Sequence, residues 1–140
     1  MKSKIAPGIV CGQLYDIFNK EVKACALSPN LRLIFRTDYV DGIARRTNSG
    51  EERIYLPGWT IAHPCFAIPL HYLLHELCHH IVGLHHNHDD IFKAKEEEIH
   101  FRYGIKLGPY FHRDCYGVLA YSGHLHYHDV RWEIEPCGGS

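Results

Sequence analysis

The segment His75-Glu76-Leu77-Cys78-His79 has the form H-E-x-x-H, with two histidines four residues apart and a glutamate after the first. Residues four apart lie one turn apart on a helix, so the two imidazoles can bind one divalent cation. Glu76 then lies beside the ion, where a carboxylate can act as a general base toward water. The spacing therefore predicts that His75 and His79 are metal ligands and that Glu76 is a catalytic residue.

A zinc ion that acts on a substrate has three protein ligands and keeps a fourth position for water, so a third ligand is expected. His88 stands nine residues after His79 and is one candidate. His85 stands six residues after His79, as in the metzincin pattern, although Gly83 is one place later than the glycine of that pattern. The third alternative is a glutamate on the next predicted helix, although an acidic run is more typical of a solvated helix face: Glu96, Glu97 or Glu98.

The helix that carries the motif is predicted over residues 69–84, because Pro69 suits a first helical turn. Its aliphatic residues lie on one arc of the helix: Leu70, Leu73, Leu74, Leu77, Ile81 and Leu84. His75, Glu76 and His79 project from the opposite side. We therefore expect one face to be buried and the other to offer the metal site, with Cys78 at the edge of the apolar arc packing as core.

Further elements are predicted on both sides of this helix. Helical periodicity indicates a first helix over residues 13–26. Alternation and turn residues indicate three strands, at 31–35, 43–47 and 53–56. A last helix is predicted over 89–103, with Asn87 or Asp89 as its N-cap and Gly104 as its stop. An irregular stretch is expected from Pro57 to Pro69, and a second small hairpin over 118–121 and 124–128. The pattern predicts an α+β class with an N-terminal helix, a small and mostly antiparallel sheet, the motif helix and one following helix.

Length and composition favour one globular domain over residues 1–140, with a core at about 13–104 and a C-terminal extension at 105–140. The chain has 140 residues, of which 46% are hydrophobic and 22% charged. A net charge of −1 gives no overall attraction to nucleic acid or anionic lipid, and no apolar run reaches the ~18 residues of a membrane span. The start of the chain lacks the apolar region of a signal peptide, so a cytoplasmic or otherwise intracellular location is expected.

Cysteine and histidine usage narrows the chemistry further. The cysteines form no C-x-x-C pair, so they are expected to be free thiols in a reducing compartment: Cys11, Cys25, Cys65, Cys78, Cys115 and Cys137. Three alternating histidines would share one side of a strand and could hold a second metal ion, although polar decoration of the strand is the favoured interpretation: His124, His126 and His128. Three more are expected to be surface groups or to support the ligands: His71, His80 and His86.

The order of these features resembles the SprT-like and WLM-type minimal zinc metallopeptidases, in which H-E-x-x-H is followed by H-x-x-x-F. The resemblance covers about residues 13–104: a helix, strands, an R-I-Y-L-P segment at 53–57, L-L-H-E-L-C-H at 73–79, and then His88 with Phe92 four residues later. It implies a minimal zincin-like fold and one zinc ion per chain, held by His75, His79 and His88, with Glu76 as the general base and Phe92 packed beside His88.

Two details of the resemblance bear on the ligand and the partner. Gly83-Leu84-His85 lies where WLM-type chains have G-P-H, so His85 stays an alternative third ligand. Asp89 replaces the glycine that usually follows the third histidine of SprT-like chains, and the Cys-paired zinc ribbon of many relatives is absent. Action on DNA-bound proteins, known in that family, is therefore not expected here.

The expected reaction is hydrolysis of a peptide bond in a peptide or protein substrate. Zinc would acidify a bound water, and Glu76 would take its proton during attack on the carbonyl and pass it to the leaving amine. An extended substrate would pair with an edge strand, for which residues 52–56 are the candidate. Four side chains could supply a second oxyanion donor: Tyr110, His112, Tyr121 and Tyr127. Two alternatives stay open: a non-catalytic zinc-binding or interaction module on a zincin scaffold, and a zinc hydrolase of another bond.

Overall fold

The computed structural model describes residues 7–63 and 66–105, which form four helices and three strands. In chain order these are α1 (Pro7–Ala24), β1 (Arg32–Arg36), β2 (Ile43–Arg46), β3 (Glu52–Pro57), α2 (Gly58–Ile61), α3 (Ala67–Val82) and α4 (Asp90–Arg102). The predicted α+β class is confirmed. The predicted hairpin at 118–128, the histidines of the second metal site, the four oxyanion candidates and Cys65, Cys115 and Cys137 lie outside the described residues.

The three strands form a mixed sheet in the order β1-β3-β2. β2 pairs with β3 in the antiparallel sense, as the hairpin prediction requires, but β1 pairs with β3 in the parallel sense. The expectation of a mostly antiparallel sheet is therefore wrong. β3 takes the centre because it carries the most buried side chains of the sheet, including Ile54, Tyr55 and Leu56, whereas β2 carries two exposed arginines and stays at the edge. The predicted substrate-pairing segment 52–56 is consequently not an edge strand.

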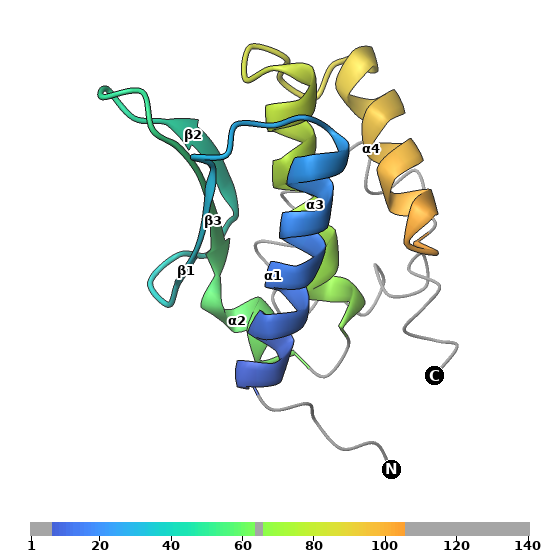
Figure 1. Cartoon of the computed structure of the whole chain (residues 1–140). Coiled ribbons are helices and arrows are strands. Elements are labelled where there is room, and N and C mark those ends of the chain that lie inside the picture. Colours follow the sequence, from blue (N-terminus) through green and yellow to red (C-terminus); the bar gives the residue numbers. More distant parts are fainter. Residues whose placement is uncertain (1–6, 64–65, 106–140) are drawn as a thin grey trace.

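The helices stack on one face of the sheet (Figure 1). α1 and α3 run beside each other next to the sheet, and α4 lies against α3 on the side away from the strands. Val10, Leu14 and Phe18 recur at helical spacing on α1 and are buried, which places this face of the helix in the core. α1 also begins at Pro7, earlier than residue 13, because Val10 continues the same buried face toward the N-terminus.

α3 is buried on all sides from Ala67 to His79, which corrects the prediction that it buries one face only. Its four leucines pack in the core, as predicted, and Ile81 lies against them, but the helix ends at Val82 and Leu84 lies beyond it. Cys78 is fully buried with its thiol directed at the Phe92 carbonyl oxygen, 3.5 Å away. The face that carries His75 is covered by α4. The irregular stretch predicted before α3 contains the short helix α2.

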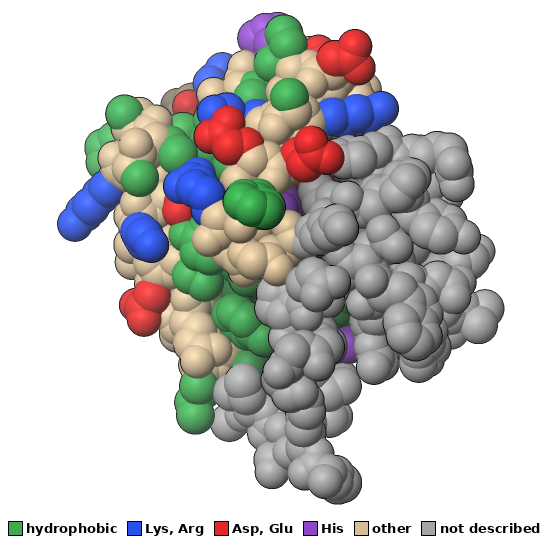
Figure 2. Space-filling model, turned by 90° about the vertical axis from the view of Figure 1, so that its right-hand side faces the viewer, with side chains coloured by type: hydrophobic (Ala, Val, Ile, Leu, Met, Phe, Trp, Pro, Cys, Tyr) green, Lys and Arg blue, Asp and Glu red, His purple; other side chains and the backbone are tan. Residues whose placement is uncertain are grey.

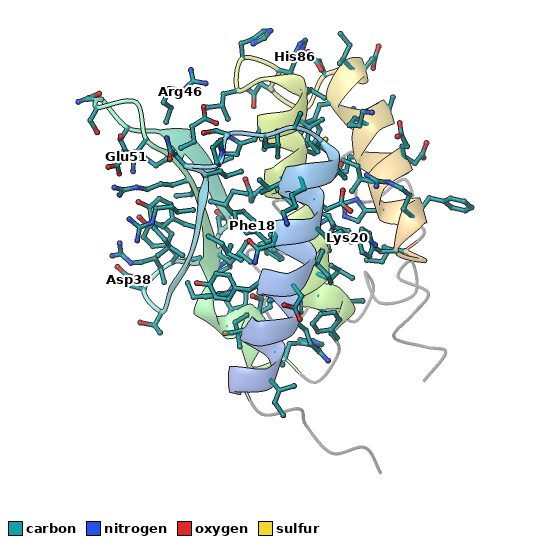
Figure 3. The ribbon with its side chains drawn as sticks, in the orientation of Figure 1. Phe18, Lys20, Asp38, Arg46, Glu51 and His86 are labelled. Atoms are coloured by element: carbon teal, nitrogen blue, oxygen red, sulfur yellow. The ribbon has the colours of Figure 1, made fainter. Side chains whose placement is uncertain are left out.

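The outer face of the sheet carries no helix among the described residues and is rich in charge. Arg32 of β1 and Arg45 of β2 are both paired with Arg53 of β3, so three arginines lie in one row across the sheet. Among the residues that the structure describes, Arg53 alone in that row has an acidic ion-pair partner, Glu51. Asp38 and Glu51 lie at the loop ends of the strands, on the side away from the helices (Figure 3). On the face that Figure 2 shows, acidic and basic side chains of the described residues are interspersed.

Two helices end in the same way. After α1 the amide of Leu27 donates to the Val22 carbonyl oxygen and that of Ala26 to the Lys23 carbonyl oxygen, with Ala26 at φ 52°. This is a Schellman motif with alanine at the left-handed position. After α4 the amides of Ile105 and Gly104 repeat the pattern, with Gly104 at φ 75°. The predicted stop at Gly104 is confirmed.

A buried carboxylate joins the first and last helices. Glu21 of α1 is buried and accepts hydrogen bonds from Arg102 Nη2, at 3.1 Å, and from the Tyr103 hydroxyl. These contacts fix the end of α4 against α1. Within residues 7–63 and 66–105, no helix combines the length and the apolar composition that crossing a membrane requires.

Candidate metal centre

Three histidine side chains meet at the interface of α3 with the segment that leads into α4. Nε2 of His88 lies 3.1 Å from Nε2 of His75 and 3.2 Å from Nε2 of His79. His75 and His79 are buried and His88 is half-buried, so the cluster reaches toward the surface on the side of His88. The structure therefore brings the first-choice ligand set together.

The spacing of these nitrogens fits a bound cation. Zn–N bonds of about 2.0–2.1 Å at tetrahedral angles place the nitrogens about 3.3 Å apart, close to the two distances here. Nitrogen lone pairs that face one another repel, and a cation between them removes that repulsion. Three imidazoles with room for a further ligand are also the donor set of catalytic zinc sites. The residues present thus fit a divalent cation that prefers nitrogen.

The protonation of two of the three rings, those of His79 and His88, favours metal binding. Burial lowers the pKa of His79 to about 3, and the electrostatic influence of His75 and His88 acts in the same direction. Burial likewise lowers the pKa of His88. Both rings are therefore neutral near pH 7 and offer a lone pair, which a metal requires of imidazole.

The backbone conformation of His88 directs its side chain toward His75 and His79. His88 adopts φ 57°, a left-handed conformation that costs a non-glycine residue about 1 kcal/mol. Asp89, the next residue, is the N-cap of α4, and its carboxylate accepts a hydrogen bond from the Phe92 amide at 2.9 Å. Of the two predicted caps, Asn87 and Asp89, the second is therefore confirmed. The Phe92 ring packs against the rings of His88 and His79, with centroids 4.9 and 4.3 Å apart. The predicted packing of Phe92 against His88 is thus present.

His85, the alternative third ligand, lies elsewhere. Its side chain is exposed, its ring lies over Gly83, and it stacks on His86 with centroids 4.2 Å apart. His86 is held by Asp89, 2.7 Å away, in the turn after α3 (Figure 3). His85 belongs to neither of the two groups of described side chains that could hold a metal ion.

Glu76 is fully buried beside this cluster. Neither of its carboxylate oxygens has a hydrogen-bond partner among the residues that the structure describes. Burial raises the pKa of Glu76 to about 7; His75 opposes the shift, and Glu96 and Asp41 add to it. The carboxylate packs against Gly42 at the start of β2, where a Cβ would stand 2.7 Å from Oε2. Gly42 is a residue that sequence reasoning did not single out.

Glu96 is the largest departure from the sequence predictions at this site. It was expected on a solvated helix face, but it is buried, and its Oε2 lies 2.5 Å from Nδ1 of His75. Glu97 and Glu98 are exposed, as expected of the run. Burial alone would lower the pKa of His75, but the charge and the hydrogen bond of Glu96 outweigh it and raise that pKa. Glu96 thus contacts a candidate ligand from behind and faces it with a negative charge.

The three histidines expected near the surface or behind the ligands differ in their surroundings. His71 is buried, and its Nδ1 lies 2.9 Å from Nε2 of His100, a residue not predicted to matter. The His80 side chain is buried and joins α3 to β3 through the Glu52 carboxylate and the Arg53 carbonyl oxygen, each 3.1 Å away. His71 therefore belongs to the surroundings of the cluster, whereas His80 is a structural contact.

Comparisons with known protein families, with curated proteins and with solved structures find no match for this chain. The case for a function therefore depends on the geometry of the site.

Proposed function

We propose that this protein is a zinc-dependent metallopeptidase of the minimal, SprT-like or WLM-type kind, with His75, His79 and His88 as metal ligands and Glu76 as the general base. The observation that carries the proposal is the convergence of three imidazole nitrogens, at 3.1 and 3.2 Å, next to a buried glutamate whose oxygens have no hydrogen-bond partner within residues 7–63 and 66–105. A carboxylate buried without partners is costly for the fold, and such groups are concentrated at functional sites.

Each residue of the site has a role that follows from its surroundings. A bound divalent cation would supply a Lewis acid that lowers the pKa of water and stabilises negative charge on a carbonyl oxygen. Glu76, with a pKa near 7, is suited to accept a proton from water and to release it to a leaving nitrogen at neutral pH. His79 and His88, whose pKa values are lowered by burial, would hold the cation through neutral rings.

The substrate class follows from the edge of the sheet. β2 lies beside α3, and on its side away from β3 it pairs with no other strand among residues 7–63 and 66–105. Because Gly42, at its start, touches the Glu76 carboxylate, a chain bound along β2 would run past that carboxylate. An extended peptide pairs with such an edge through backbone hydrogen bonds. We therefore assign substrate pairing to β2 in place of segment 52–56.

The test is Glu76→Gln, which keeps the size of the side chain and removes its basicity. The purified variant is expected to hold the same one zinc per chain by elemental analysis and to lose hydrolysis of a broad peptide library. Glu97→Gln, an exposed neighbour of the site on α4, is the matched control and should retain activity. Full activity in Glu76→Gln would refute the role of Glu76 as the general base. A wild-type protein that binds zinc and cleaves only another bond, such as an ester, would refute the peptide substrate.

The ligand assignment is tested by two single variants. His88→Ala is expected to lower bound zinc well below one equivalent, because it removes the nitrogen that lies within 3.2 Å of both others. His85→Ala is expected to leave zinc unchanged, because that ring is exposed and stacked on His86. The reverse result would move the third ligand to His85.

A further inference from the structure

Behind the candidate metal ligands, four buried side chains form a second cluster between α3 and α4. His71 and His75 lie one turn apart on α3, and Glu96 and His100 lie one turn apart on α4. The exposed fraction of each residue is 2% or less. Polar groups buried this deeply need defined hydrogen-bond partners, so the contacts in this cluster indicate which atom of each pair donates and which accepts.

The first link runs from His100 to His71. Nδ1 of His100 lies 2.7 Å from the Glu96 carbonyl oxygen, and because a carbonyl only accepts, this nitrogen carries the proton. Burial keeps the His100 ring neutral, so its Nε2 has a lone pair and accepts from Nδ1–H of His71 at 2.9 Å. This chain of hydrogen bonds ties the Glu96 backbone on α4 to α3.

The second link runs from Glu96 to His75. Oε2 of Glu96 accepts from Nδ1–H of His75 at 2.5 Å. With its proton on Nδ1, the neutral His75 ring has its lone pair on Nε2, the nitrogen that faces His88 at 3.1 Å. A hydrogen bond from the far nitrogen of a ligand to a carboxylate fixes the tautomer and orientation of the ring and increases its basicity.

We propose that Glu96 is a positioning residue, which fixes His75 in the tautomer and orientation that metal binding needs, and that the His71–His100 pair holds Glu96 in place. The inference rests on the proposed metal site and adds to it a carboxylate that is not itself a ligand. Glu96 has a second consequence. Its negative charge offsets part of the charge of a cation bound on the other side of the ring, in a region where charges are poorly screened.

The group His71, His75 and Glu96 also has the spacing of a metal site of its own. The hydrogen bonds favour the positioning role over a second ion. Nδ1 of His75 and the Glu96 carboxylate are already paired, and a metal between them would require His75 to bridge two ions as a doubly deprotonated ring.

The test compares Glu96→Gln and Glu96→Ala with wild type in a metal-binding competition. Zinc affinity is measured against a chromophoric chelator. Loss of a carboxylate behind a ligand weakens metal binding on the order of 10- to 100-fold. We expect Glu96→Ala to show such a loss and Glu96→Gln, which can still accept the hydrogen bond, to lose less. Glu97→Gln is the control on the same helix and should match wild type. Equal affinities in all folded variants would overturn the proposal.

A second measurement does not depend on how the variants fold. Long-range ¹H–¹⁵N spectra of wild-type protein with bound zinc report which nitrogen of each histidine carries a proton. The expected result is a proton on Nδ1 of His75 and on Nδ1 of His100. An Nδ1 of His75 without a proton in the zinc-bound protein would refute the inference. Binding of a second zinc equivalent that His71→Phe abolishes would also refute it, because His71 and Glu96 would then be ligands. A wild-type protein without zinc affinity would refute the proposed function and this inference together, whereas failure of the Glu96 variants to differ would refute this inference alone.

Discussion

Gly42, at the start of β2, touches the carboxylate of Glu76 on α3: a Cβ at position 42 would stand 2.7 Å from Oε2 and 3.1 Å from Cγ of the glutamate. Gly42 is not among the glycines with positive φ, so the backbone there permits other residues. The requirement for glycine therefore comes from the carboxylate that lies against it. This contact couples the edge strand to the proposed general base.

Gly42→Ala is expected to displace the Glu76 carboxylate while the histidines stay in place. A displacement of about 1 Å of a catalytic group costs on the order of 100-fold in rate, so peptide hydrolysis should fall by about that factor. Zinc per chain should stay unchanged, because the substitution touches none of the candidate ligands. Peptidase assays and elemental analysis on the same preparation check both parts.

Gly12→Ala is the matched control for this substitution. Gly12 lies on α1 with no atom near the position of a Cβ, and alanine there should stabilise the helix by roughly 0.5–1 kcal/mol without affecting hydrolysis. Undiminished activity in Gly42→Ala would show that the Glu76 carboxylate has room to move and is not held by β2.

Burial of Glu76 predicts a pH-dependent cost in the metal-free protein. The pKa of Glu76 is about 7 in the folded chain and near 4.5 when unfolded, so the folded state holds the proton more tightly. Below pH 4 both states are protonated and the group has no cost. As the pH rises from about 4.5 through 7, the unfolded state ionises first and wild type loses stability.

Glu76→Gln removes this loss, so its advantage over wild type should grow with pH. The difference in unfolding free energy should rise by roughly 3 kcal/mol between pH 4 and pH 8, as measured by urea denaturation with chelator present. The neighbouring histidines are common to both proteins and largely cancel in the comparison. A flat difference for Glu76→Gln would mean that its carboxylate is ionised at neutral pH in the folded chain.

Local signals were sufficient to predict the motif helix and its immediate surroundings. The aliphatic arc of α3, the cap at Asp89 and the stop at Gly104 are each encoded within one or two turns of chain. The pairing of β2 with β3 is likewise encoded by the turn between them. The parallel pairing of β1 with β3 was missed because no local turn specifies it; it depends on which strand carries the most buried side chains.

The burial of Glu96 was missed for a different reason. The run of three glutamates suggested solvent exposure, but Phe92, Glu96, Ile99 and His100 recur at helical spacing, and all four are buried. The same helical periodicity that placed the leucines of α3 on one face also places Glu96 and His100 on the apolar face of α4. A charged residue on such a face indicates a buried partner. For Gly42 the sequence carries no comparable signal, because the contact with Glu76 joins segments that are far apart in the chain.

The two Schellman motifs predict opposite effects of glycine and alanine. Ala26 has φ 52°, a conformation that costs a non-glycine residue about 1 kcal/mol, so Ala26→Gly should stabilise the protein by roughly 0.5–1 kcal/mol. Gly104→Ala should destabilise it by about 1 kcal/mol at φ 75°. Midpoints of urea denaturation at unchanged slope measure both effects. Ala24→Gly is the control, since it lies within α1 and should lose stability. Destabilisation by Ala26→Gly would show that loss of entropy outweighs the relief of strain.

The row of Arg32, Arg53 and Arg45 across the outer face of the sheet predicts repulsion that salt relieves. Like charges directly opposite on neighbouring strands destabilise a sheet by roughly 0.2–1 kcal/mol, and Arg45 has no acidic ion-pair partner among the described residues. Arg45→Gln should therefore stabilise the protein at low ionic strength. The gain should shrink in about 1 M salt, where charges are screened beyond ~3 Å.

Arg46→Gln provides the opposite case on the same strand. Arg46 is paired with Glu52 at 3.1 Å on the other face, so its removal should be neutral or destabilising at low salt, and that effect should also fade as salt is added. Denaturation midpoints of both variants at low and high salt test the pair. If added salt changes the stability effects of Arg45→Gln and Arg46→Gln with the same sign, the row of arginines is not a source of repulsion. Glu51 and the surrounding water would then already screen the charges of the row.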